Sequence, residues 1–145
     1  MKFLLDTNAV SEPTHPRPDA GYVAWFMGVG DSNDPLDDVL NVSVLTIAEL
    51  RRGVSRLGSG RRRSELEVAI ELLVNEYGPR ILAVDLAVAE VWSEIAENNR
   101  RKGVIVGAID ELIAATAIAH DLTLVTRNVG HFNSTGCKLL CPWSD

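Results

Sequence analysis

Cysteine is scarce in this sequence, and its scarcity excludes two kinds of site. The 145 residues include only two cysteines, Cys137 and Cys141, in a segment that we expect to be extended. Extended geometry would hold their Cα atoms about 13 Å apart. A disulfide needs a separation below roughly 7 Å. No histidine or further cysteine stands nearby to complete a zinc site. We therefore interpret both cysteines as small core residues.

Long apolar runs are also missing. No stretch approaches the roughly 18 uninterrupted apolar residues of a membrane span. The N-terminal run Phe3-Leu4-Leu5 ends at Asp6 and is too short for the core of a signal peptide. We therefore expect a cytoplasmic protein.

Positive charge is in deficit, with 14 Lys plus Arg against 20 Asp plus Glu and a net charge of −6. Taken as a whole-chain average, this balance argues against a nucleic-acid partner. Apolar residues make up 46% and charged residues 23% of the chain, which is typical of a globular protein. A chain of this length buries roughly 68–70% of its unfolded surface. We predict one domain over residues 1–145.

Short apolar segments alternate with helical patterns along the chain. The segments predict five strands, at residues 3–5, 39–44, 81–84, 122–126 and 138–141. Helices are predicted from a cap at Asp19 through residues 22–26, from a cap at Thr46 over 47–57, at 61–77, from a cap at Asp85 to Asn98, and at 108–120. Loops are expected at 28–38 and 100–107, and the prolines allow at most a short helical turn over 11–18. The alternation predicts an α/β fold with a mainly parallel five-stranded sheet.

Two helices differ in the width of their apolar faces. The helix at 108–120 is apolar nearly all round, so we expect it to be central and buried. The stretch Leu66–Val74 has an apolar stripe that suits either core packing or a groove for a partner protein.

Three carboxylates stand where a buried core would not place them. Asp6 follows the first strand, Glu49 lies near the start of the helix after the second strand, and Asp110 opens the most apolar helix. Each alone is also what a helix cap looks like. Active sites of open parallel sheets lie at the carboxyl ends of the strands, so we expect all three at one edge. Gathered carboxylates repel unless a cation neutralises them. Oxygen ligands alone suit Mg²⁺ or Mn²⁺, the ions of phosphodiester hydrolysis.

These residues also carry a family resemblance. The blocks FLLDTNAVSE, SVLTIAELRRGVSRL and GAIDELIAATAIAHDLTLVTRNVGHF, in this order and spacing, resemble the PIN-domain ribonucleases. The likeness is greatest to the VapC-type toxins of bacterial toxin–antitoxin pairs, in the FitB-like branch. It implies a three-layer sandwich around the sheet, Mg²⁺- or Mn²⁺-dependent endonucleolytic cleavage of RNA, a cognate antitoxin and a homodimer.

The resemblance also implies roles for individual residues. Asp6, Glu49 and Asp110 would hold the metal ion. Asn8 would orient a ligand or a metal-bound water, and Thr7, Ser43 and Thr46 are candidates for supporting contacts or plain helix caps.

The chain departs from the family pattern after the fourth predicted strand. Many relatives carry a fourth acidic residue in this block, whereas this chain has the neutral Asn128, and His131 stands where an Asp before Phe is common. We still place Asn128 in the catalytic set, because its amide oxygen can hold a metal or a metal-bound water. The lower charge predicts one firmly bound ion, with any second ion recruited by the RNA phosphate.

Basic residues are concentrated rather than scattered. Residues 51–63 contain six arginines and no acid, and Arg100, Arg101 and Lys102 form a second basic cluster. Guanidinium groups bind phosphate bidentately, so the strip suits RNA, although an antitoxin tail is an equal candidate. The residues assigned to RNA or antitoxin binding are Arg51, Arg52, Arg56, Arg61, Arg62, Arg63 and Arg127.

Two other functions compete with a metal-dependent ribonuclease. One is a catalytically degenerate PIN domain that binds RNA or protein, for which the neutral Asn128 is the motive. The other is a phosphatase of the haloacid dehalogenase type, which needs a second Asp two residues after Asp6, where this chain has Asn8. The sequence favours the ribonuclease.

Overall fold

The computed structural model describes residues 2–29 and 40–144. Its five strands are β1 (Phe3–Leu5), β2 (Leu40–Ser43), β3 (Ile81–Leu82), β4 (Thr123–Val125) and β5 (Lys138–Leu140). They form one sheet in the order β3-β2-β1-β4-β5, and every neighbouring pair is parallel. The α/β class and the five-stranded sheet are therefore confirmed. The strands are shorter than predicted, and the predicted start of the second strand at Val39 lies outside the described residues.

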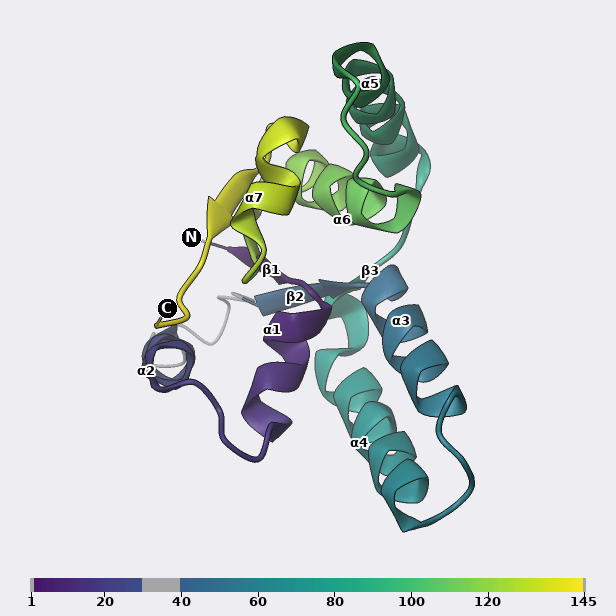
Figure 1. The fold of residues 1–145 in the computed structure, drawn as a ribbon, viewed down its shortest axis with the longest axis vertical. Helices are drawn as coiled ribbons and strands as arrows, with labels where there is room; N and C mark the ends of the chain where they lie inside the picture. Colours follow the sequence, from purple (N-terminus) through teal and green to yellow (C-terminus); the bar gives the residue numbers. More distant parts are fainter. Residues whose placement is uncertain (1, 30–39, 145) are drawn as a thin grey trace.

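Seven α-helices and three short 3₁₀ turns connect the strands within the described ranges (Figure 1). The helices are α1 (Thr7–Ser11), α2 (Ala20–Val29), α3 (Val44–Ser55), α4 (Arg61–Tyr77), α5 (Leu86–Lys102), α6 (Ala108–Ala119) and α7 (Val129–Phe132). The 3₁₀ turns are η1 (Glu12–Thr14), η2 (Gly78–Arg80) and η3 (Asn133–Thr135). The turn η1 is the short helical turn expected among the prolines. Most of the predicted loop at 28–38 lies outside the described residues, but Gly28 and Val29 belong to α2.

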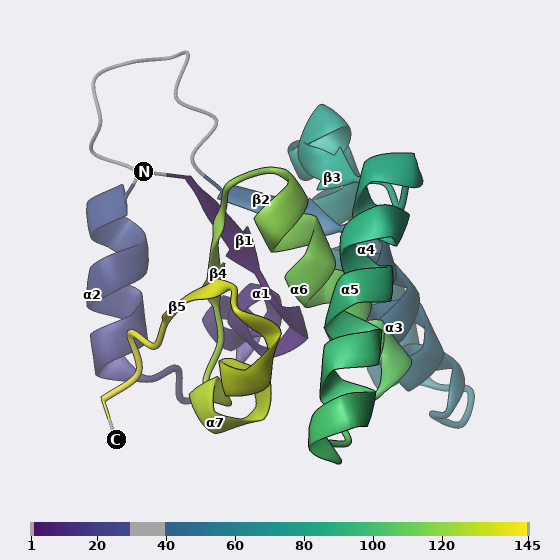
Figure 2. The same cartoon turned by 90° about the horizontal axis from the view of Figure 1, so that it is seen from above.

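Helices cover both faces of the sheet, which makes three layers (Figures 1 and 2). Helices α5, α6 and α7 lie on one face, where Leu4 and Leu124 point into a core around Ile113. Helices α1 to α4 lie on the other, where Leu5 and Val125 pack with Tyr22. Successive strand residues thus feed opposite cores, because side chains alternate along a strand. The middle of α6 is buried as expected, with Ile113 1% exposed and residues 114–117 fully buried, but Ile109 and Ile118 near its ends are exposed.

The cap of α3 differs from the prediction. The helix begins at Val44, and Ser43 is its N-cap, with the Ser43 hydroxyl accepting a hydrogen bond from the Leu45 N–H at 3.0 Å. Thr46, the predicted cap, is already inside the first turn and fully buried. Ser43 and Thr46 are equally suitable caps by sequence alone. Ser43 is the cap because β2 ends there and the helix begins directly after it. Glu49 consequently falls in the second turn of α3.

Helix α5 runs four residues further than predicted. Arg100, Arg101 and Lys102, expected in a loop, form its last turn. Cations are favourable there because the carboxyl end of a helix carries partial negative charge. Gly103 ends the helix in the left-handed conformation, with φ 68°.

Three further expectations concern the cysteines, the apolar stripe of α4 and membrane spans. Cys137 is half-buried, but Cys141 is exposed at the edge of β5, so its interpretation as a core residue is wrong; both thiols are free. On α4, the apolar stripe faces inward, with Ile70 buried and Leu66 and Leu73 half-buried, whereas Val68 and Leu72 on the opposite side of the helix are about 60% exposed. Across residues 2–29 and 40–144, no helix combines the length and the apolar character that a membrane span requires.

The order of the strands fixes where a site can form. From β1 the chain moves outward to β2 and β3, then crosses back to place β4 on the other side of β1. The carboxyl ends of β1 and β4 therefore flank the point where the strand order reverses, which is where open α/β sheets bind ligands. Asp6 follows β1 there, and Thr126, Arg127 and Asn128 follow β4.

Candidate active site

Asp6 stands at the carboxyl end of β1 and is only 7% exposed. Its backbone N–H donates to the carbonyl of Val125, which ties it to β4. Its side chain caps α1, with Oδ1 accepting from the Ala9 N–H at 2.8 Å. The same short segment thus ends the strand, starts the helix and fixes the carboxylate at the reversal point of the sheet.

The surroundings of Asp6 disfavour its charge. Burial raises the pKa of the Asp6 carboxyl above its ordinary value of 3.8, and hydrogen bonds from Thr126 and from the Ala9 N–H oppose that rise. The nearby carboxylates of Asp110 and Glu49 raise the pKa further. No ion pair joins Asp6 to a basic residue in the described part of the chain. Asp110 and Glu49 therefore lie close enough to Asp6 for their negative charge to disfavour its ionised form.

Glu49 reaches the site from the second turn of α3. The Thr7 hydroxyl donates to Glu49 Oε1 at 2.7 Å, across 42 residues of sequence. Because Thr7 directly follows Asp6, this bond ties α3 to the end of β1. The supporting role of Thr7 stays a prediction, and this contact with Glu49 is consistent with it. Thr46 lies one turn earlier on α3, and its buried hydroxyl has no hydrogen-bond partner among the described residues.

Asp110 lies in the first turn of α6 and contacts His131, which was not predicted as a site residue. His131 Nε2 is 2.8 Å from Asp110 Oδ2, and both side chains are partly exposed. His131 belongs to α7, which follows β4, so the contact joins α7 to the start of α6. The signal in the sequence was the histidine at a position where relatives carry an Asp.

The two predicted amide residues lie at the same edge and are exposed. Asn128 is at the N-cap position of α7, where its backbone N–H donates to the Thr126 hydroxyl at 3.0 Å. The Asn128 side chain forms no hydrogen bond with a described residue, so the catalytic role of Asn128 stays a prediction. Asn8, on α1, faces a pocket together with Arg127. Thr126, which contacts Asp6, was missed because a threonine ending a strand carries no distinctive pattern.

The donor set of Asp6, Glu49 and Asp110 has the chemistry for a hard divalent cation, since it offers carboxylate oxygens and no thiolate. Within residues 2–29 and 40–144, however, no three Asp, Glu, His or Cys side chains stand close enough together to coordinate an ion. Glu49 and Asp110 are instead held by Thr7 and His131. The three carboxylates thus lie at one edge of the sheet, and their role as metal ligands stays a prediction.

The predicted arginine strip divides into two groups. Arg51 pairs with Glu71, Arg61 with Glu65 and Arg63 with Glu67, at 2.8, 2.8 and 2.9 Å. The other members of the strip form no ion pair with a described residue. Arg52 and Arg56 line a hollow of about 240 Å³ together with Glu49 and Ile109. Arg62 and Arg127 line the pocket that contains Asn8.

Known proteins match this chain over almost its full length. The PIN domain family matches residues 3–136. Toxin FitB of Neisseria gonorrhoeae is 37% identical over 144 residues, 99% of each chain. VapC ribonuclease Y4jK of Sinorhizobium fredii is 30% identical over 142 residues, 97% of each chain. The crystal structure of FitAcB from Neisseria gonorrhoeae matches with a TM-score of 0.85 and 35% identity over 99% of each chain. The resemblance read from the sequence is thereby confirmed, and this chain belongs to the PIN domain family, with a FitB toxin and a VapC ribonuclease among its relatives.

Proposed function

We propose that this protein is a divalent-metal-dependent endoribonuclease toxin that cuts RNA in the cytoplasm and inhibits translation until a cognate antitoxin neutralises it. One observation carries the proposal: a buried carboxylate at the reversal point of the sheet has two further carboxylates beside it and no described basic partner. Such an arrangement costs stability, and a structural role does not require it. The likeness to a VapC ribonuclease and to toxin FitB supports the same reaction and the same biological role.

Asp6, Glu49 and Asp110 would hold the ion, Mg²⁺ or Mn²⁺. When bound, such an ion lowers the pKa of a coordinated water and offsets charge on the phosphate. The chain's own residues set up the ligands. The Ala9 N–H fixes Asp6, the Thr7 hydroxyl fixes Glu49, and His131 fixes Asp110. Arg52 and Arg56, beside Glu49, provide positive charge for the substrate backbone.

The partners follow from the family. Relatives are named as toxins, so we propose that an antitoxin covers the site until it is degraded. We also propose a homodimer, for which the exposed Ile105, between α5 and α6, offers apolar surface. A catalytically degenerate module that only binds RNA remains the competing proposal, because Asn128 is neutral.

The test is cleavage of single-stranded RNA by the purified protein freed of antitoxin. We expect cleavage with Mg²⁺ or Mn²⁺, none with EDTA, and none from Asp6→Ala. The control is Asp121→Ala, which removes an exposed carboxylate paired with Lys138 and should cleave as the wild type does. Cleavage that survives Asp6→Ala would overturn the assignment. A degenerate binding module would instead bind RNA equally well as wild type and as Asp110→Ala, and neither would cut.

A further inference from the structure

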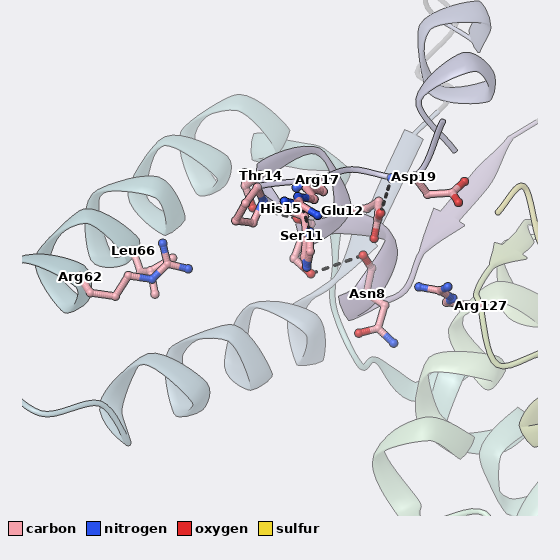
Figure 3. Close-up of a pocket in the computed structure, with 11 residues that line it drawn as sticks. Asn8, Ser11, Glu12, Thr14, His15, Arg17, Asp19, Arg62, Leu66 and Arg127 are labelled. Atoms are coloured by element: carbon pink, nitrogen blue, oxygen red, sulfur yellow. Dashed lines mark hydrogen bonds between the residues drawn. The ribbon is translucent and has the colours of Figure 1, made fainter. Parts of the chain in front are cut away.

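A pocket beside the carboxylates collects three arginines from distant parts of the chain. Arg17 follows η1, Arg62 lies in the first turn of α4, and Arg127 follows β4. The pocket has a volume of about 520 Å³, within the range of about 300–1,000 Å³ that is usual for ligand sites. In Figure 3, Arg62 and Arg127 lie at opposite ends of the pocket, with Ser11 and Asn8 between them.

These arginines have no carboxylate partner within ion-pair distance among the described residues. The pocket does contain two acids, but the chain's own donors engage both. Glu12 accepts a hydrogen bond from the Asp19 N–H at 2.8 Å. Asp19 accepts from the Tyr22 N–H and from the N–H and hydroxyl of Ser144. These hydrogen bonds, led by that of the Ser144 N–H, lower the pKa of Asp19 to about 2. Three cations therefore face two carboxylates that already have partners.

The position of Arg62 near the N-terminus of α4 is electrostatically unfavourable. The first turn of α4 contains Arg61, Arg62 and Arg63 and no acid. The N-terminus of a helix carries partial positive charge, so each cation there is unfavourable by about 0.3–1 kcal/mol. Glu65 and Glu67 offset the charges of Arg61 and Arg63 through ion pairs one turn on. Arg62 has no such compensation in the described residues, and a local rule broken without compensation is typical of a functional position.

The lining of the pocket favours a phosphate over a protein partner. It is mostly polar or charged, and Leu66 is its main aliphatic side chain. The more apolar lining belongs to an adjoining hollow of about 90 Å³ between α1, α3 and α4, which shares Ser11, Thr14 and Leu66 with the pocket and adds Val10, Leu50 and Ile70. A protein segment would use that apolar hollow, whereas planar guanidinium groups suit the oxygens of a phosphodiester. The pocket is adjacent to the carboxylate site along the chain, because its lining residue Asn8 lies two residues after Asp6, and Arg127 directly follows Thr126, which contacts Asp6.

We propose that Arg17, Arg62 and Arg127 form a phosphate-binding subsite that holds the backbone of single-stranded RNA next to the cleavage site. This inference rests on the proposed function, because it takes the substrate to be RNA. Of the arginines predicted to bind RNA or antitoxin, it assigns Arg62 and Arg127 to RNA, and it adds Arg17, which was not predicted from the sequence. Arg51, Arg61 and Arg63 are engaged with glutamates instead.

The experiment measures binding without cleavage. A fluorescein-labelled single-stranded oligoribonucleotide is titrated with antitoxin-free protein in EDTA, and the anisotropy is followed over a series of salt concentrations. For single strands the slope of log K against log salt is about −0.7 for each phosphate that the protein neutralises. Arg17→Ala/Arg62→Ala/Arg127→Ala should therefore lower the steepness of this slope, taken as a positive number, by about 2. Arg62→Ala alone should lower it by about 0.7, and Arg61→Ala, which removes a guanidinium already paired, should change it less. Lys138→Ala is the control for loss of charge on a distant surface.

Several results would overturn the subsite. One is a triple variant that keeps the wild-type slope, and another is Arg61→Ala and Arg62→Ala weakening binding equally. A triple variant that keeps RNA binding but no longer captures the cognate antitoxin would assign the pocket to the antitoxin instead. Equal thermal midpoints show that the variants are folded. Because cleavage is not measured in EDTA, failure of the subsite and failure of the ribonuclease assignment give different results. Where the wild type cleaves RNA with Mn²⁺, the triple variant should raise KM and leave kcat unchanged.

Discussion

The two hydroxyl residues at the start of α3 should respond to mutation in opposite directions. Ser43 caps the helix and bonds the Leu45 N–H, whereas the Thr46 hydroxyl is buried without a partner in the described structure. Ser43→Ala removes a satisfied cap, and Thr46→Val replaces an unsatisfied hydroxyl by a methyl group of nearly the same shape. The pair separates the observed cap from the one that the sequence predicted.

The magnitudes follow from these contacts. Loss of a serine cap costs about 1 kcal/mol. A buried hydroxyl without a hydrogen bond costs about 1–3 kcal/mol, so Thr46→Val should recover an amount in that range. For a domain of this size, 1 kcal/mol corresponds to about 2–4 °C in Tm. We therefore expect Ser43→Ala to melt about 2–4 °C lower than the wild type and Thr46→Val to melt at least about 2 °C higher.

The assay is urea unfolding followed by circular dichroism, with thermal midpoints as a second measure. The m-values should stay equal, so that shifts of the midpoint report stability. If Thr46→Val lowers the stability, the Thr46 hydroxyl has a partner in solution that the structure does not contain, and the reasoning from unsatisfied burial fails. Equal losses from both substitutions would restore Thr46 as part of the cap.

Three further predictions concern the site and its support. Asp6→Asn should stabilise the protein at neutral pH, because burial raises the pKa of Asp6 and the charged form is therefore disfavoured in the folded state. Asn is about as good an N-cap as Asp, so the substitution should keep the cap of α1. The gain in stability should be largest above the raised pKa of Asp6 and should fade as the pH falls towards 3.8. A gain in urea unfolding that does not depend on pH would contradict this. His131→Ala should weaken Mn²⁺ binding about 10–100-fold in calorimetric titration because Asp110 loses its orienting partner, and His131→Gln should restore part of it; unchanged affinity would show that His131 does not position Asp110. Tyr22→Phe should cost about 1–3 kcal/mol in urea unfolding, because the buried Tyr22 hydroxyl donates to the Ala9 carbonyl, and a neutral result would mean that water replaces the bond.

The sheet could be predicted from the sequence because each strand lies in a short segment rich in apolar residues. Its parallel arrangement followed from the helices between the runs, and the placement of Asp6, Glu49 and Asp110 at one edge followed from that topology. The limits of the elements were less predictable. Ser43 and Thr46 are both good caps locally, and only the position where β2 leaves the sheet decides between them. The α5 helix continued through Arg100 to Lys102 because charge at its carboxyl end favours helix.

The contacts within the site depended on folding. His131 and Asp110 are 21 residues apart and Thr7 and Glu49 are 42 apart, so no local pattern links them. The division of the arginine strip was partly visible. Arg61–Glu65 and Arg63–Glu67 have the i,i+4 spacing of helical ion pairs. The meeting of Arg62 with Arg127 in one pocket required the tertiary fold.

The net charge of −6 misleads when it is read as an average. The acidic residues include the three at the site, and arginines without a described partner lie beside them on both the α1 and the α3 side. A bound cation would offset part of the acidic charge at the site. An RNA strand would then meet positive charge locally despite the overall balance.

The central claim is that Asp6, Glu49 and Asp110 act as one unit in RNA cleavage. The most direct measurement compares the single-turnover cleavage rate of Asp6→Asn, Glu49→Gln and Asp110→Asn with that of the triple variant, with Mn²⁺ and the same RNA. Groups that act together are strongly non-additive. We therefore predict that Asp6→Asn alone loses nearly as much activity as the triple variant. Losses that multiply from one substitution to the next, or any single variant that cleaves at the wild-type rate, would contradict the account.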